Sequence, residues 1–237
     1  MIDRTVRIGL LIAVALAGSP IVVAQESPSP SSVQERVVLL KTSLAASQAN
    51  LRQYEWIETT VVSLKGEEKS RKQQRCYYGA DGVLQKVTID ASPPPATKRG
   101  IRGKIIANKT AELTDYMQNA VGLVKSYVPP DPAKIQAAKN AGKVSIDVLE
   151  PGQRAQLNFR DYQKPGDNLG IQVDVANNRV LGLTVATYLD SPQDRVMLNV
   201  TMQQLNDGTS YAADVKLDAP AKDLTVTTQN TGYRKAN

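Results

Sequence analysis

Histidine is absent from this 237-residue sequence, and cysteine occurs once, at Cys76. Without histidine, the chain cannot form a Ser-His-Asp or Cys-His catalytic arrangement or a histidine-containing metal site, and we expect no cofactor and no metal. A single cysteine excludes an intramolecular disulfide, so packing and hydrogen bonds alone must hold the fold. Because Cys76 precedes two tyrosines in a strand-like segment, we expect a small buried hydrophobe rather than a reactive thiol.

The sequence also lacks the glycine-rich patterns that bind nucleotides. Gly79 to Gly82 and Gly100 to Gly103 have neither the spacing nor the strand-to-helix context of a Walker or dinucleotide-binding loop. The formal charge of +6 is spread along the chain and forms no basic stripe interleaved with aromatics. We therefore expect no nucleic-acid partner, whereas the positive charge favours weak attraction to an anionic membrane surface.

Aromatic residues are scarce, with one phenylalanine, one tryptophan and a total of 5% of the chain. Since 41% of the residues are hydrophobic, aliphatic side chains must do most of the packing. A chain of this length fits one ordinary domain, and we expect it to be a monomer.

The first 24 residues, Met1 to Ala24, have the features of a secretory signal peptide. Two arginines form the positive start, an apolar run follows, and Val22 to Ala24 gives a small-residue cleavage pattern. An uncleaved membrane anchor is the alternative, but Pro20 and the shortness of the run argue against it. We expect cleavage near Ala24 and a periplasmic or secreted mature protein, in which residues 25–31 form a Ser/Pro spacer and residues 32–237 form a single domain.

The N-terminal part of that domain combines one helix with a β-meander. Val33, Val37, Leu40 and Leu44 recur at the spacing of one helical face, which predicts an amphipathic helix ending near residue 51. From Leu51 to Val87 the chain then alternates and turns, with glycine-containing turn signals at residues 65–67 and 79–82. Three paired strands are predicted.

Two helices interrupt the strands that follow. The apolar residues change to a helical period between Lys104 and Val128, and Asp131 to Ala141 predicts a second, shorter helix. Between the strands and the first of these helices, we expect Lys98 to Lys104, KRGIRGK, to be a flexible basic linker. From Val144 onward nearly all of the sequence alternates with period two. The pattern predicts an α+β fold built on one large curved antiparallel sheet of about ten strands.

Paired carboxylates are the remaining candidates for catalysis. Glu55 with Glu58, or Glu67 with Glu68, can be nominated as an acid and base pair. Neighbouring surface acids are common, so we do not expect an enzyme, and a carboxylate hydrolase stays an alternative.

The order of these elements resembles the LolA-like superfamily, which includes outer-membrane lipoprotein carriers and related periplasmic lipid-binding proteins. An export signal, an amphipathic helix, a meander opening with YEWIETTVVSLKG, an inserted helical pair and a long run of strands carry the resemblance, from Val33 to Tyr233. It implies an incomplete β-barrel whose concave face is covered by the N-terminal helix and the inserted helical pair.

The resemblance further implies a hydrophobic ligand between sheet and helices, either a lipid or the acyl chain of a lipidated protein. The side chains implied to line that cavity are Trp56, Leu64, Leu113, Met117, Val124, Tyr127, Phe159, Val173, Val185 and Leu198. Ordinary core positions are the alternative for each of them. For the whole protein, the alternative is a cell-envelope interaction or structural module without a ligand cavity, which would expose an apolar patch or an open sheet edge.

Overall fold

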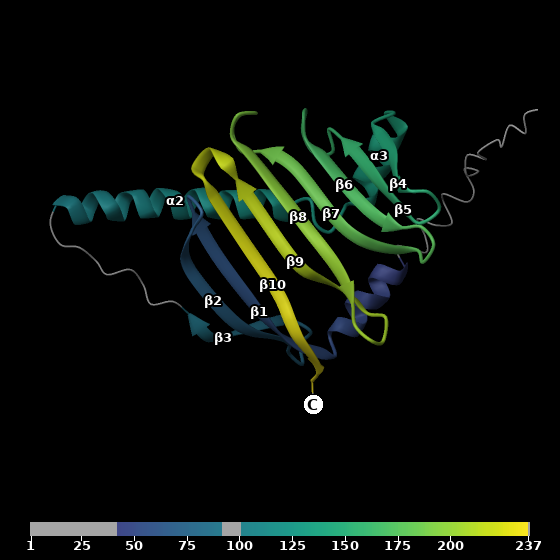
Figure 1. Ribbon diagram of the computed structural model, residues 1–237, viewed down its shortest axis with the longest axis horizontal. Coiled ribbons are helices and arrows are strands. Elements are labelled where there is room, and N and C mark those ends of the chain that lie inside the picture. Colours follow the sequence, from purple (N-terminus) through teal and green to yellow (C-terminus); the bar gives the residue numbers. More distant parts are fainter. Residues whose placement is uncertain (1–41, 92–100, 237) are drawn as a thin grey trace, which may run out of the picture.

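The computed structural model describes residues 42–91 and 101–236, with side chains in residues 42–91 and 108–236. Its centre is one open antiparallel sheet of ten strands in the order β3-β2-β1-β10-β9-β8-β7-β6-β5-β4 (Figure 1). The strands are β1 (Tyr54–Leu64), β2 (Glu67–Tyr78), β3 (Leu84–Ala91), β4 (Val144–Glu150), β5 (Arg154–Arg160), β6 (Asn168–Asp174), β7 (Arg179–Tyr188), β8 (Arg195–Gln204), β9 (Ser210–Ala219) and β10 (Leu224–Lys235).

Three α-helices in the described part of the chain lie against the sheet. The first covers residues 42–51, where Ser47 Oγ accepts a hydrogen bond of 3.0 Å from the backbone N–H of Ser210. Helix α2 (Ile101–Lys125) crosses the back of the sheet and projects past β2 (Figure 1). The Tyr116 hydroxyl in α2 donates to Asp194 Oδ1 at 2.5 Å, which anchors this helix to the β7–β8 connection. Helix α3 (Pro132–Asn140) is capped by the Asp131 side chain.

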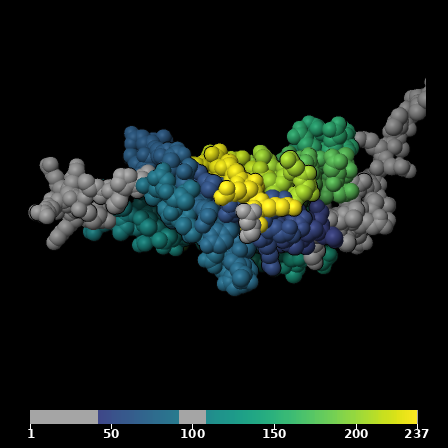
Figure 2. Space-filling view, turned by 90° about the horizontal axis from the view of Figure 1, so that it is seen from below, coloured from purple at the N-terminus to yellow at the C-terminus, as the bar shows by residue number. Residues whose placement is uncertain are grey.

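The sheet has one apolar face, which we call the inner face because the helices lie on it. A row of paired residues crosses eight strands on this face and joins the core cluster that includes side chains of α2 and α3. The row runs from β4 to β1 through Val144, Phe159, Leu169, Val185, Leu198, Leu217, Val226 and Val62. In the view from below, the purple N-terminal helix also lies beneath the yellow and green strands (Figure 2).

The outer face of the sheet is polar. The residues that alternate with the core row are Ser145, Asn158, Gly170, Thr184, Asn199, Lys216, Thr227 and Val61. This division explains the clean period of two in the second half of the sequence, since one face packs on helices and the other meets water.

The predicted fold class is confirmed: an α+β chain with an open ten-stranded antiparallel sheet, an N-terminal helix and two inserted helices packed on the sheet. The first predicted hairpin is also found, because Lys65 and Gly66 connect β1 to β2 with φ of 55° and 77°. The signal peptide and the Ser/Pro spacer lie outside the described residues.

One predicted boundary is wrong. Residues 98–104 were expected to be a linker, but α2 begins at Ile101, so the last four of them are helical. A glycine inside a helix costs only about 1 kcal/mol relative to alanine, and a helix of 25 residues tolerates Gly103.

Candidate functional site

The ten predicted lining residues do not form a single group. Six of them lie in or against the core cluster between sheet and helices: Met117, Val124, Tyr127, Phe159, Val185 and Leu198. Val173 and Trp56 are buried elsewhere on the sheet, while Leu64 and Leu113 are half-buried. None of the ten lines either of the two hollows described below.

A second apolar row on the inner face is more accessible than the core row. We call it the inner strip, and it consists of Ile146, Leu157, Ile171, Leu183, Val200 and Val215, paired across β4 to β9. Leu157, Ile171 and Val215 are only half-buried. The inner strip is therefore an apolar row across six strands, in which Leu183 and Val200 are buried in the core cluster and the accessible part lies toward β4.

The inner strip opens toward solvent at the edge strand β4. Ile146 is 54% exposed and Val148, two residues along the same face, is 65% exposed. Leu149 on the same strand is 45% exposed as well, and a group of exposed aliphatic side chains on an edge strand is typical of a binding surface. The sequence predicted that Ile146 and Val148 lie in a strand but did not mark them as part of a binding site. The alternation of apolar residues from Val144 and from Ala155 already indicated that they share one face of the sheet.

Tyr127, one of the predicted lining residues, takes part in a buried hydrogen-bond network. Its hydroxyl donates to Asp167 Oδ2 at 2.5 Å and lies 2.9 Å from Thr187 Oγ1. Oδ2 also accepts from the backbone N–H groups of Gln163 and Lys164, each at 3.0 Å. Burial, and then the hydrogen bond to Asp167, raise the pKa of Tyr127. This tyrosine, two residues after the end of α2, thus ties the segment that follows the helix to the loop before β6.

Trp56 lies in a small aromatic cluster on the inner face of β1 and β10. Its ring stacks on Tyr233 with a centroid distance of 5.4 Å and an interplanar angle of 14°, and Tyr78 lies 6.1 Å away. The indole N–H donates to Asn230 Oδ1 at 3.0 Å. Cys76, which pairs with Trp56 across β1 and β2, is fully buried, as predicted, and burial raises the pKa of its thiol.

The carboxylate pairs nominated from the sequence do not converge. Glu55 and Glu58 are three residues apart on a strand, so they point to opposite faces. Glu58 forms an ion pair of 2.6 Å with Lys86 on the inner side. Glu67 and Glu68 pair with Lys69 and Arg71 beside the β1–β2 hairpin. Neither pair provides two acids facing a common cleft.

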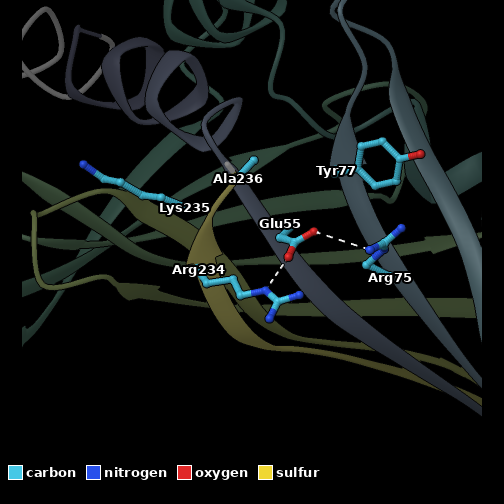
Figure 3. Close-up of a pocket in the computed structure, with 6 residues that line it drawn as sticks. All are labelled: Glu55, Arg75, Tyr77, Arg234, Lys235 and Ala236. Carbon is cyan, nitrogen blue, oxygen red and sulfur yellow. Dashed lines mark hydrogen bonds and ion pairs between the residues drawn. The ribbon is translucent and has the colours of Figure 1, made fainter.

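Glu55 belongs instead to a charged cleft of about 460 Å³ on the outer face (Figure 3). The residues that line it are Glu55, Arg75, Tyr77, Arg234, Lys235 and Ala236. Glu55 Oε1 accepts from Arg234 Nε, and its Oε2 lies 3.9 Å from Arg75 Nη1. An exposed ion pair at such a distance contributes only about 0–1 kcal/mol. Sequence reasoning missed the two arginines, because β2 and β10 are far apart in the chain.

A smaller hollow of about 170 Å³ lies on the same face, over β5 to β8. Polar side chains such as Gln156, Gln172 and Asn199 line it, around Gly182. A Cβ at Gly182 would lie 2.6 Å from the carbonyl oxygen of Val200, so only glycine fits without a shift of the backbone.

Comparisons with known proteins leave the family open. No protein-family model matches the chain, and no curated protein matches it. Among solved structures, the chain is similar to a DUF1329 family protein from Desulfovibrio piger, with 7% identity over 86% of this chain and 92% of the other, and a TM-score of 0.36. A likeness of this strength assigns no function, and membership of the LolA-like superfamily stays a prediction.

Within the part of the chain that the structure describes, no helix is long and apolar enough to cross a membrane. The same residues contain no cluster of three or more acidic or cysteine side chains suited to a metal ion.

Proposed function

We propose that this chain is an exported, non-enzymatic protein of the cell envelope that binds a lipid, or the acyl chain of a lipidated protein, on the inner face of its sheet. The observation that carries the proposal is the inner strip, an apolar row across six strands that opens to solvent at Ile146 and Val148. Burying a lipid tail on this surface requires no catalytic group, which agrees with a chain that has no histidine.

The dimensions and the free energy favour a single acyl chain. Six strands at a spacing of about 4.8 Å span about 24 Å, and the accessible part of the inner strip, from Ile146 on β4 to Ile171 on β6, spans about 10 Å. Each CH₂ group removed from water contributes about 0.8 kcal/mol, so ten of them contribute about 8 kcal/mol before the cost of association. Micromolar affinity corresponds to a net gain of about 8 kcal/mol, and association costs at least about 4 kcal/mol, so about fifteen CH₂ groups must leave water for reversible micromolar binding.

A second candidate function is a protein-interaction module. β4 is an edge strand of the sheet, and it carries both exposed side chains, Ile146 and Val148. A strand from a partner could pair with this edge while covering the two side chains. Binding of free fatty acid would favour the lipid proposal over this one, because edge pairing needs a polypeptide.

The double replacement of Ile146 and Val148 by serine tests the lipid proposal. Each side chain loses about 1 kcal/mol of contact with a bound acyl chain, so we expect Kd for a fluorescent fatty acid to rise at least about tenfold. Met197→Ser is the matched control, since Met197 is 37% exposed on β8 but alternates with the buried residues Val196 and Leu198 and therefore faces outward. Unchanged affinity in the double variant, or an equal loss in M197S, would contradict the proposal.

A further inference from the structure

The charged cleft on the outer face holds one carboxylate between two guanidinium groups that come from different strands. Glu55 on β1 pairs with Arg234 on β10 and with Tyr77 on β2, and Arg75 lies two residues from Tyr77 on the same face. Figure 3 shows Arg234 and Arg75 on opposite sides of Glu55, while the Lys235 side chain points away. The three side chains that meet in the cleft therefore carry a net charge of +1.

Both guanidinium groups keep donors available for a ligand. Arg234 uses Nε on Glu55, and its two terminal nitrogens have no partner among the described residues. Arg75 reaches Glu55 only at 3.9 Å, and its guanidinium carbon lies 5.4 Å from the centre of the Tyr77 ring. The Glu55 side chain is 17% exposed, whereas those of Arg75 and Arg234 are 45% and 72% exposed. The guanidinium N–H groups at the mouth of the cleft are therefore accessible to a ligand from solvent.

The backbone under the cleft is held in place. β10 pairs with β1 as far as Lys235, opposite Tyr54, and the N–H of Ala236 then donates to the carbonyl oxygen of Gln53 at 2.8 Å. The end of β10 is thereby fixed to the segment that joins the N-terminal helix to β1. Arg234 consequently projects from an ordered strand rather than from a free chain end, which reduces the ordering cost of binding a ligand.

We propose that this cleft binds a phosphate-type oxyanion, with the terminal nitrogens of Arg234 and the guanidinium of Arg75 as its donors. Arginine presents paired N–H groups that match two oxygens of a phosphate, and a phosphate group carries more charge than the Glu55 carboxylate. Glu55 positions Arg234 through Nε and competes with the ligand for Arg75. A volume of about 460 Å³ is within the range of small-molecule sites and admits more than the phosphate group itself.

Two sources offer this chemistry, a soluble phosphate compound and the headgroup of an anionic phospholipid. Neither source depends on the lipid proposal for the inner face, because the cleft lies on the opposite face of the sheet. Inorganic phosphate and vesicles of phosphatidylglycerol, with phosphatidylcholine vesicles as reference, are therefore the two probes. Phosphate binding is followed by ³¹P line broadening and vesicle binding by co-sedimentation.

Substitutions in the cleft distinguish a ligand-binding site from a group of ion pairs that only stabilises the fold. We expect Arg75→Gln with Arg234→Gln to weaken binding at least tenfold, and Glu55→Gln to strengthen it several-fold because the competing charge is removed. Arg154→Gln is the matched control, since Arg154 is 46% exposed and pairs with Glu150 on another part of the sheet. Circular dichroism verifies that each variant folds.

The outcomes are distinct. Saturable binding of inorganic phosphate with this pattern of variants supports the proposal and identifies a soluble ligand. The same pattern with phosphatidylglycerol vesicles alone supports it and identifies a headgroup. Absence of saturable binding to both probes, an equal loss in R154Q, or weaker binding in E55Q would overturn it.

Discussion

Replacing Asp167 by alanine is expected to lower the free energy of unfolding by about 4 kcal/mol, because three donors lose their shared acceptor. Asp167 is buried, and its Oδ2 accepts from the Tyr127 hydroxyl and from the N–H groups of Gln163 and Lys164. Removal of the carboxyl group leaves the two N–H groups without an acceptor among the described residues and leaves the Tyr127 hydroxyl only Thr187 Oγ1 as a partner. It also detaches the segment after α2 from the loop that precedes β6. Urea denaturation followed by circular dichroism measures the change.

Two milder variants control this prediction. Asp167→Asn keeps one oxygen in place for the same donors, and Oδ1, which would be replaced by the amide nitrogen, has no hydrogen-bond partner among the described residues. We expect a loss of about 1–2 kcal/mol for D167N and a similar loss for Tyr127→Phe, which removes one hydroxyl from the network. If D167A lowered the free energy of unfolding by no more than D167N does, the network would not hold the segment after α2 to the loop.

Trp56→Ala is expected to cost about 4 kcal/mol of stability, the typical loss for a buried tryptophan. The replacement removes the ring that stacks on Tyr233 and leaves the Asn230 side chain without its indole donor. The same denaturation experiment measures it, with fatty-acid binding recorded on the folded fraction. Because Trp56 lies in the aromatic cluster and outside the inner strip, we expect stability to change more than affinity.

Trp56→Phe is the control for ring packing. It keeps an aromatic ring beside Tyr233 but loses the hydrogen bond, so we expect about half the cost of the alanine variant. A W56A protein as stable as the wild type would show that the cluster does not stabilise the sheet. A W56A protein that stays stable but loses fatty-acid binding would instead make Trp56 a ligand contact, as the family resemblance implies.

The fold was predictable because its signals are local. A strict period of two from Val144 onward marks strands with one covered and one solvated face, and glycine-containing turns separate those strands. The start of α2 was missed because the glycines at 100 and 103 suggested a break, whereas the helix tolerates the second of them.

The candidate sites were less predictable because they depend on pairing across the sheet. Ile146 and Val215 belong to one apolar row only because six strands are in register, and the sequence does not show which row the helices cover. Arg75 and Arg234 meet Glu55 only because β10 returns to pair with β1 in the middle of the sheet. Tyr127 lies in the core cluster between sheet and helices, and its buried acceptor Asp167 has no local signal in the sequence.

The most direct test of lipid binding on the inner face is to look for a ligand that the protein already carries. The chain from Gln25 to Asn237, which is the mature form proposed to result from signal-peptide cleavage, is purified without detergent from a bacterial periplasm. It is extracted with organic solvent and analysed by mass spectrometry beside the I146S/V148S variant. We predict close to one lipid or acyl chain per wild-type molecule and a clear loss in the variant. A wild-type protein that carries no lipid and also fails to take up added fatty acid or lipopeptide would contradict the proposal.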